Sequence, residues 1–159
     1  MKKSVITFIK SPYAKVFFGF LLLDFITKIL AASNAIQVTV IDQFFYLSYS
    51  RNTGAAWSIL EGYQWILALV SFGVGSLFFY YYLHQYAQHG LYQHLGMSLF
   101  LSGTWGNFID RAFYPEGVID FLSFHFGDYI FPTFNIADSA LTIGVIILIT
   151  TSVLERKKV

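Results

Sequence analysis

Four long apolar stretches constrain the fold of this chain more than any other feature of its sequence. They cover about residues 14–32, 63–83, 91–109 and 135–154. Each is long enough to cross the hydrocarbon core of a bilayer as a helix, which takes about 20 residues. A strand barrel would need alternating apolar and polar residues, whereas these stretches are continuous. The sequence therefore predicts an all-α membrane protein with four transmembrane helices, built as a single membrane domain over residues 1–159.

Composition supports a membrane location. Of the 159 residues, 56% are hydrophobic and only 12% are charged, and a soluble domain of this size could not bury so much apolar surface. Lysines precede the first stretch and small residues follow it, as in a cleaved signal peptide. We predict instead a retained span, because Asp24 and Lys28 interrupt the apolar run and further spans follow.

Basic residues gather at the two chain ends. They are Lys2, Lys3, Lys10 and Lys15 before the first span, and Arg156, Lys157 and Lys158 after the last. Four spans put both ends on one side, and lysine and arginine are enriched on the cytoplasmic side, so we expect both termini there. The terminal lysines are interpreted as topology signals. No basic patch indicates binding to nucleic acid.

The two loops predicted on the outward side, residues 33–62 and 110–134, carry signals for extended chain. In the first, "IQVTVIDQFFYLSYS" alternates β-branched and aromatic residues, which predicts strands at the membrane surface. The second is again aromatic, and it is broken at Pro115, Gly117, Gly127 and Pro132. Aromatic side chains suit the lipid headgroup level. We therefore expect a small β-rich cradle on the periplasmic, or extracytoplasmic, side.

Small residues recur at a spacing of four in the last two spans. Ser102 and Gly106 lie in the third span, and Ala140 and Gly144 lie in the fourth. This spacing lets helix backbones approach closely, so it predicts tight packing of these two helices against their neighbours.

Ionisable side chains inside a bilayer need a partner or a purpose, because each costs about 2.5–3.5 kcal/mol. Asp24 and Lys28 are four residues apart in the first span, with the acid on the N-terminal side. That order favours an ion pair along a helix. The pair either only neutralises itself or also serves a site, and the sequence leaves both interpretations open.

The segment "RNTGAAW" returns the chain to the membrane after the first outward loop. Asn52 offers hydrogen-bond donors and acceptors, and Gly54 allows close approach of the backbone. Taken alone, the segment is typical of a turn.

The segment "SGTWGNFIDR" places further polar groups in the third span. Asn107 and Asp110 are three residues apart on one helix face, and Arg111 lies at the outer end. A buried amide such as that of Asn107 needs partners. Arg111 either extends to the headgroups or keeps Asp110 or Asp24 charged.

Two aspartates are predicted to meet at the outer side of the membrane. Asp120 lies in "VIDF" just after the third span, and Asp138 lies in "NIAD" at the start of the fourth, where Asn135 is the expected N-cap. A carboxylate is favoured at a helix N-terminus. Two close carboxylates in a low dielectric share one proton, the arrangement of an aspartic hydrolase. Ion-pathway carboxylates and structural hydrogen bonding remain the alternatives.

Other catalytic chemistries find little support in the sequence. There is no cysteine, no Ser/His pair stands out, and no spacing typical of metal ligands occurs, so we expect neither a metal nor another cofactor. His84, His89 and His94 are expected to be solvated near the cytoplasmic loop. His125 is expected to lie at the membrane interface rather than in a catalytic site.

Two rival functions fit parts of the pattern. A small proton- or cation-coupled transporter also needs intramembrane carboxylates, but near the midplane and along a path to both sides. A scaffold that only binds lipidated peptides would need a pocket without paired acids. The crowding of aspartates in the outer half favours the hydrolase.

Five motifs in order resemble those of the bacterial lipoprotein signal peptidases, the signal peptidase II family. They are "DFITK", "RNTGAAW", "GNFIDR", "VIDF" and "FPTFNIADS", spread from Asp24 to Ser139. The family often has paired glycines before "GN" in the third span, where this chain has Ser102 and Gly103. The resemblance extends over essentially the whole chain, and the spacing of five motifs makes it specific.

The resemblance implies an intramembrane aspartic endopeptidase of the bacterial cytoplasmic (inner) membrane with its active site near the outer leaflet. Its substrate is a prolipoprotein, cut just before a cysteine that carries diacylglycerol, so the expected partners are this lipidated substrate and membrane lipid. We expect a monomer. By motif, Asp120 and Asp138 are the catalytic dyad. The positions associated with substrate binding and positioning are Asn52, Gly54, Asn107, Arg111, Asn135, Asp24 and Lys28.

Overall fold

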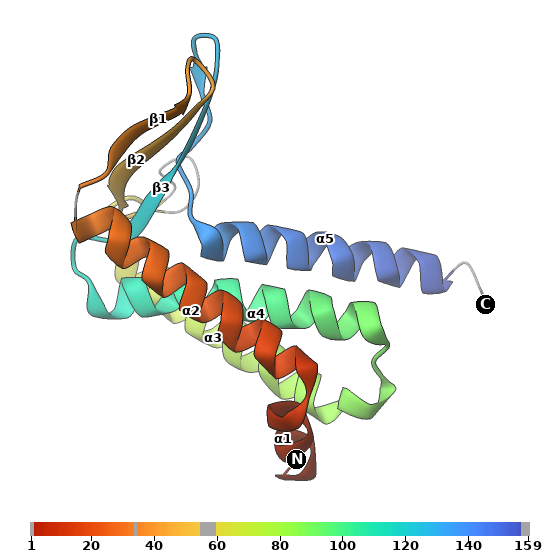
Figure 1. Ribbon diagram of the computed structural model, residues 1–159. Coiled ribbons are helices and arrows are strands. Elements are labelled where there is room, and N and C mark those ends of the chain that lie inside the picture. Colours follow the sequence, from red (N-terminus) through yellow and green to blue (C-terminus); the bar gives the residue numbers. More distant parts are fainter. Residues whose placement is uncertain (1, 34, 55–59, 157–159) are drawn as a thin grey trace.

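A computed structural model describes residues 2–33, 35–54 and 60–156 of the chain. The helices are α1 (Lys2–Lys10), α2 (Pro12–Ser33), α3 (Gln64–His84), the single 3-10 turn η2 (Tyr86–Gln88), α4 (Leu91–Phe113) and α5 (Ile136–Arg156). The strands are β1 (Gln37–Ile41), β2 (Phe45–Asn52), β3 (Val118–Phe126) and β4 (Tyr129–Ile130). The four long helices run side by side with the sheet at one end, and both chain ends lie toward the other (Figure 1).

The long helices fall at the four predicted apolar stretches, but not all of them have the surface of a membrane span. By length and hydropathy, α2, α3 and α5 are candidates to cross a membrane among the described residues. The helix α4 is equally long, but it packs against all three of the others. Because its neighbours shield it, α4 can carry buried polar side chains that lipid would not tolerate. Three candidate spans are therefore established where four were predicted.

Close approach of α4 to its neighbours depends on small residues, as predicted. A Cβ atom at Gly144 of α5 would lie 2.5 Å from the backbone nitrogen of Phe100 in α4. A Cβ atom at Gly106 of α4 would lie 2.8 Å from a carboxylate oxygen of Asp24 in α2. Because the Gly144 contact is with backbone, α4 is held against α5 at a distance that only glycine permits, whereas Gly106 leaves room for the Asp24 carboxylate.

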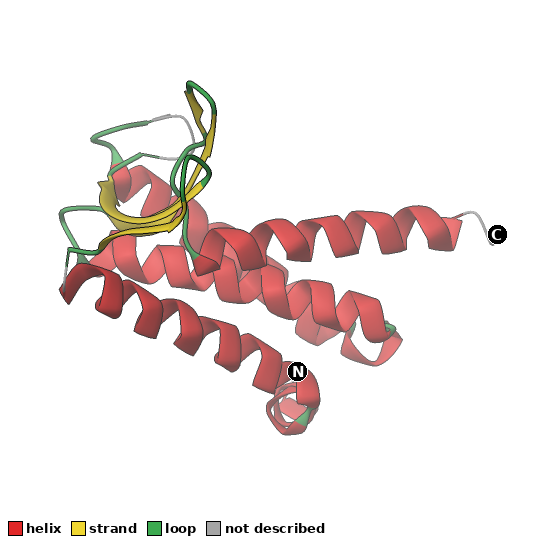
Figure 2. Ribbon diagram, turned by 45° about the horizontal axis from the view of Figure 1, so that its top comes forward, coloured by secondary structure: helices red, strands yellow, loops and turns green. Residues whose placement is uncertain are grey.

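The two loops that were predicted on the outward side form the predicted strands. The sheet is antiparallel, with strand order β1-β2-β3-β4, and it rises from one end of the bundle (Figure 2). Its register pairs Ser50 with Asp120 and Asn52 with Val118. Leu122 exchanges backbone hydrogen bonds with Phe134, which ties the chain just before α5 to β3. The "RNTG", "VIDF" and "NIAD" motifs are thereby brought to one place.

Two features at the opposite end differ from expectation. The helix α1 was not anticipated, since its lysines were interpreted only as topology signals. The prediction that His94 is solvated is wrong. His94 is 6% exposed, stacks on Tyr13 with ring centroids 4.3 Å apart, and lies 2.9 Å from the Tyr82 hydroxyl. The imidazole is buried because aromatic side chains of α2, α3 and η2 close over this end of the bundle. His84, by contrast, is exposed.

Candidate active site

Asn135 caps the start of α5, as "NIAD" predicted, and Asp138 returns a hydrogen bond to it. The Asp138 backbone N–H donates to Asn135 Oδ1 at 2.9 Å, and the Asn135 backbone N–H donates to Asp138 Oδ2 at 3.2 Å. This is the geometry of a capping box, in which the first and fourth residues satisfy each other's free backbone donors. The positive end of the helix dipole also favours a negative charge on Asp138. Local sequence thus fixes the position of this carboxylate.

Asp120 is presented by β3 and is held by two side-chain amides. It is 2% exposed. Asn52 Nδ2 donates to its Oδ2 at 3.0 Å, and Asn135 Nδ2 donates to its Oδ1 at 2.7 Å. The sheet register supplies Asn52, because β2 and β3 pair side by side at this point.

Asp138 is linked to Asp120 through two asparagines. Asn107 Nδ2 donates to Asp138 Oδ1 at 2.7 Å. The Asn135 Nδ2 group that bonds Asp120 also lies 3.2 Å from Asn107 Oδ1. The two carboxylates therefore belong to one hydrogen-bonded network with contributions from α4, α5, β2 and β3.

Lys28 binds to this network through Asn107 and to two further acids. Its Nζ lies 2.7 Å from Asp24 Oδ2 and 2.9 Å from Asp110 Oδ2, and it donates to Asn107 Oδ1 at 3.2 Å. An ammonium group has three donors, and here each has one partner. Because Lys28 occupies the Asn107 oxygen, the Asn107 amide nitrogen is directed at Asp138. The predicted Asp24–Lys28 ion pair is confirmed, and Lys28 also contacts the amide oxygen of Asn107.

The acids of this buried cluster bond further elements. Asp24 Oδ1 accepts a hydrogen bond from the Ala137 backbone in α5 at 2.7 Å. Asp110 Oδ2 accepts one from the Ile119 backbone in β3 at 3.3 Å. The cluster of Lys28, Asp24 and Asp110 thus joins α2, α4, α5 and β3 under the two aspartates.

Arg111 forms no short ion pair with Asp24 or Asp110 among the described residues, because Lys28 pairs with both acids. The hypothesis that Arg111 helps to keep one of them charged stays a prediction. Arg111 Nη2 instead donates to the Gly54 carbonyl oxygen at 3.3 Å, which places Gly54 at the edge of the site. Its buried Nε has no hydrogen-bond partner within the described part of the chain. The remainder of "RNTGAAW", residues 55–57, lies outside the described residues.

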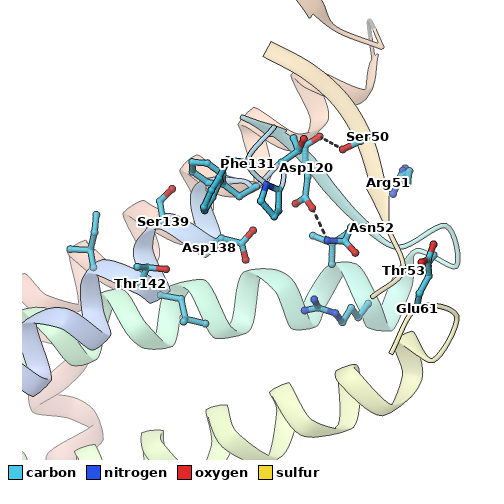
Figure 3. Close-up of a pocket in the computed structure, with 17 residues that line it drawn as sticks. Ser50, Arg51, Asn52, Thr53, Glu61, Asp120, Phe131, Asp138, Ser139 and Thr142 are labelled. Carbon is cyan, nitrogen blue, oxygen red and sulfur yellow. Dashed lines mark hydrogen bonds between the residues drawn. The ribbon is translucent and has the colours of Figure 1, made fainter. Parts of the chain in front are cut away.

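A cavity of about 850 Å³ opens over the two aspartates. Asp120 and Asp138 both point into it, with Asn52 beside Asp120 (Figure 3). One side is lined by polar groups of β2 and the segment after it, including Glu61. The other side runs from Phe131 to Ile143 of α5 and mixes apolar side chains with hydroxyl groups such as those of Ser139 and Thr142. The cavity therefore has a polar wall near the sheet and a mixed wall along α5, a candidate membrane span.

Ser50 was not predicted from the sequence as a site residue, and Gly117 was interpreted only as a break in the loop. Ser50 lines the cavity and lies 3.4 Å from the Asp120 carbonyl oxygen; its spacing of two from Asn52 in a strand would have revealed it. Gly117 was expected only to interrupt the loop. Its φ is +94°, and a Cβ atom there would collide with the carbonyl oxygen of Asn52. Gly117 thus lets β2 and β3 close around Asp120.

Electrostatics near Asp120 favour a protonated carboxyl group. Burial and, to a lesser extent, the neighbouring Asp138 charge raise the pKa of Asp120 to about 7, against the opposing hydrogen bonds from Asn52 and Asn135. Two carboxyl groups in one buried network cannot both ionise freely, so they titrate as a pair. One acid and one base side by side can activate water and protonate a carbonyl group at the same time.

Comparisons with known proteins found similarity over most of the chain. A family model described as "Signal peptidase (SPase) II" matches residues 16–154. A lipoprotein signal peptidase of Bacillus pumilus (strain SAFR-032) is 42% identical over 149 residues, covering 92% of this chain and 95% of that protein.

Two solved structures, each described as a bacterial membrane enzyme, are also similar. The first, at 2.3 Å resolution, superposes with a TM-score of 0.82 at 32% identity and covers 92% of this chain and 90% of that one. The second, at 1.9 Å, has a TM-score of 0.76 at 34% identity and covers 87% of this chain and 90% of that one.

Proposed function

The chain belongs to the signal peptidase II family of aspartic peptidases, and from that premise we propose that Asp120 and Asp138 form its catalytic dyad. The activity is that of a bacterial membrane protease that cleaves lipoprotein signal peptides. The observation that carries the assignment is the shared network, in which Asn135 and Asn107 join both carboxylates at the wall of one cavity.

The two aspartates take different roles in the first step. Asp138 is the base, because the helix N-terminus and two hydrogen bonds stabilise its charge. Asp120 is the acid, consistent with a pKa raised to about 7. Water attacks the scissile carbonyl carbon, its proton passes to Asp138, and Asp120 protonates the carbonyl oxygen. The product of this step is a neutral tetrahedral diol.

Collapse of the diol restores both groups. The C–N bond breaks as Asp138 returns its proton to the leaving nitrogen, and a diol hydroxyl returns a proton to Asp120. The signal peptide leaves with a carboxyl terminus, and the lipoprotein leaves with a free amino group on its first cysteine. No acyl-enzyme forms at any stage, which fits a chain without cysteine.

Neighbouring residues position the reaction. Asn52, Asn107 and Asn135 hold the carboxyl groups in place. The Nε of Arg111, which has no partner among the described residues, is available for a substrate carbonyl group, and the Gly54 carbonyl oxygen holds the guanidinium through Nη2. Lys28 and Asp24 keep the Asn107 amide oriented. Together these contacts pre-organise the site before substrate arrives.

The membrane arrangement follows from the same features. We propose that α4 is a fourth span shielded by α2, α3 and α5, with both termini in the cytoplasm and the sheet on the outer face of the cytoplasmic membrane. The active site then lies near the outer leaflet, where diacylglycerol on the substrate cysteine holds the scissile bond. The apolar side chains of Leu141 and Ile143 on the α5 side of the cavity are suited to contact the acyl chains. One copy supplies the proposed dyad and the residues that hold it, so a monomer suffices for the proposed activity.

A transporter is the weaker alternative. Transport requires carboxylates along a path between the two sides of the membrane. In this chain Asp24, Asp110, Asp120 and Asp138 lie together at the sheet end, and the described remainder of α3, α4 and α5 contains Glu155 as its one acid. The clustering supports a single reaction centre.

The substrate assignment is tested with purified protein in detergent or bicelles. A diacylglyceryl-modified precursor and its unmodified counterpart are supplied at equal concentration, and the products are identified by mass spectrometry. Only the modified precursor should be cut, with the new amino terminus at the lipidated cysteine. Equal cutting of both precursors, or transport of protons by vesicles without any cutting, would contradict the proposal.

A further inference from the structure

The helix α1 is fixed to the end of the bundle that faces away from the sheet. Phe8 is 2% exposed and packs edge-on against Phe17, Phe79 and Tyr82, with ring centroids 5.6–6.2 Å apart. These three rings belong to α2 and α3. A fully buried aromatic anchor of this kind holds α1 in one place.

A single residue separates α1 from the first long helix. The Ser11 hydroxyl donates to the Phe8 carbonyl oxygen at 2.7 Å and accepts from the Ala14 backbone at 3.3 Å. Ser11 therefore ends α1 and caps α2, and Pro12 follows at the first helical position, where proline is preferred. The chain turns sharply here, and α1 crosses the direction of the long helices steeply in both views (Figures 1 and 2).

The outer surface of α1 divides into an apolar and a basic flank. Ile6 and Ile9 are 47% and 60% exposed, and their spacing of three puts them on one flank. Lys3, Thr7 and Lys10 recur at spacings of four and three on the next flank, and all are exposed. With nine residues α1 is too short to span a bilayer. The exposure of Ile6 and Ile9 therefore cannot be explained by a transmembrane position of this helix.

Positive charge continues beyond α1 at this end of the molecule. Lys15 is exposed on the first turns of α2, and Arg156 is exposed at the end of α5. The segments 2–23, 63–109 and 139–156 contain Glu155 as their one acidic residue, and it accepts a hydrogen bond from Gln93. This end therefore presents positive charge beside exposed apolar side chains.

We propose that α1 is an interfacial helix that binds anionic phospholipid headgroups in the leaflet at this end of the bundle. Ile6 and Ile9 enter the boundary between headgroups and acyl chains, while Lys3, Lys10 and Lys15 pair with lipid phosphates. A helix with one apolar flank and one basic flank is built for that location. Because Phe8 and Ser11 fix α1 to α2 and α3, binding at this leaflet also sets the depth of the whole bundle, and with it the depth of the dyad at the other end.

The location of α1 is measured by spin labelling, which the absence of cysteine makes straightforward. Single labels are placed by Ile9→Cys and Thr7→Cys in the full chain, reconstituted in vesicles of phosphatidylcholine and phosphatidylglycerol in equal amounts. The Ile9→Cys label should be reached by oxygen and protected from a water-soluble nickel complex, with the reverse for Thr7→Cys. Equal access of the nickel complex to both labels would overturn the interfacial placement.

The lipid preference is measured on the same protein by native mass spectrometry of bound phosphatidylglycerol against phosphatidylcholine. The variant Lys3→Gln/Lys10→Gln/Lys15→Gln should lose the preference for phosphatidylglycerol by roughly fivefold per lysine, whereas the triple change to arginine should keep it. A matched control, Gln37→Glu/Thr39→Glu/Gln43→Glu, lowers the net charge equally on the β1 hairpin and should also keep it. An unchanged preference in the glutamine variant, or an equal loss in the hairpin control, would refute headgroup binding by α1.

Discussion

Asn135 and Asp138 bond each other twice, once through each backbone N–H, at 2.9 and 3.2 Å. The proposed catalytic base is thereby part of the cap that starts α5. Asn135 uses its amide nitrogen at the same time to hold Asp120 at 2.7 Å. One side chain therefore sets both the start of the helix and the relation between the two carboxyl groups.

The two roles of Asn135 can be separated by substitution. Serine keeps a capping oxygen but loses the amide donor, whereas alanine loses both. Asn135→Ser and Asn135→Ala should each lower the cleavage rate by about 10- to 100-fold, because Asp120 loses a partner. Alanine should also cost about 1 kcal/mol more than serine in the free energy of unfolding. Rates and thermal midpoints of both variants are compared with wild type. Equal stability of the two would argue against the capping role.

Replacing Lys28 alone should lower the free energy of unfolding more than replacing Lys28, Asp24 and Asp110 together. Lys28→Met leaves Asp24 and Asp110 buried and unpaired, at a cost of about 3–5 kcal/mol. Adding Asp24→Asn and Asp110→Asn removes both stranded charges and should recover a large part of that loss. Thermal unfolding of the single and triple variants in the same detergent measures the difference. A triple variant no more stable than Lys28→Met would show that the ion pairs are not the main role of Lys28.

The raised pKa of Asp120 predicts the pH dependence of cleavage. With a pKa of about 7, Asp120 holds its proton below neutrality and loses it above, so the rate should fall about tenfold per pH unit on the alkaline side. The hydrogen bond from Asn52 lowers the pKa of Asp120, so Asn52→Ala should move the alkaline limb to higher pH. Rate profiles for both proteins test this. A limb that stays in place would mean that another group controls it.

The raised pKa of Asp120 also makes the free energy of unfolding depend on pH. Because the pKa of Asp120 is raised from 3.8 to about 7, the folded protein binds more protons than the unfolded chain between these values. This contribution to the free energy of unfolding is fully present below pH 3.8 and is lost as pH rises through about 7. Asp120→Asn should remove this part of the pH dependence in thermal unfolding, whereas Asp128→Asn, an exposed change in the β3–β4 turn, should not.

Two glycines in long helices should respond oppositely to the same change. At Gly144 a Cβ atom would meet backbone atoms of α4 at 2.5 and 2.7 Å, whereas at Gly73 nothing lies within 4 Å. Gly144→Ala should therefore destabilise the protein by about 1–3 kcal/mol, and Gly73→Ala should be neutral or stabilising. Thermal midpoints of the pair give the comparison. A similar effect at both positions would contradict the close packing of α4 on α5.

Local rules predicted much of this structure because the decisive signals were local. The apolar stretches, the alternating residues of β1 and β2, and the cap at Asn135 each depend on a few neighbouring positions. The spacing of four between Asp24 and Lys28 likewise predicted their ion pair. The proposed roles of these residues in catalysis remain predictions.

Contacts between segments that are distant in the sequence could not be predicted from local patterns. Lys28 takes Asp110 as a second partner because α2 and α4 pack against each other, so Lys28 rather than Arg111 makes the short ion pairs with both acids. The polar face of α4 needed three neighbouring helices to bury it, which no window of its own sequence reveals. His94 is buried for the same reason, since the rings that cover it come from other helices.

The central claim is that Asp120 and Asp138 act as one unit, and the most direct test is the cleavage rate of Asp120→Asn, Asp138→Asn and the double variant on lipidated precursor. Each single change should lower the rate by at least about 1,000-fold, and the double variant should be no slower than the single ones, because residues that act together do not contribute additively. Thermal midpoints near wild type would show that the variants fold. A single variant that stays within about tenfold of wild type would contradict the dyad.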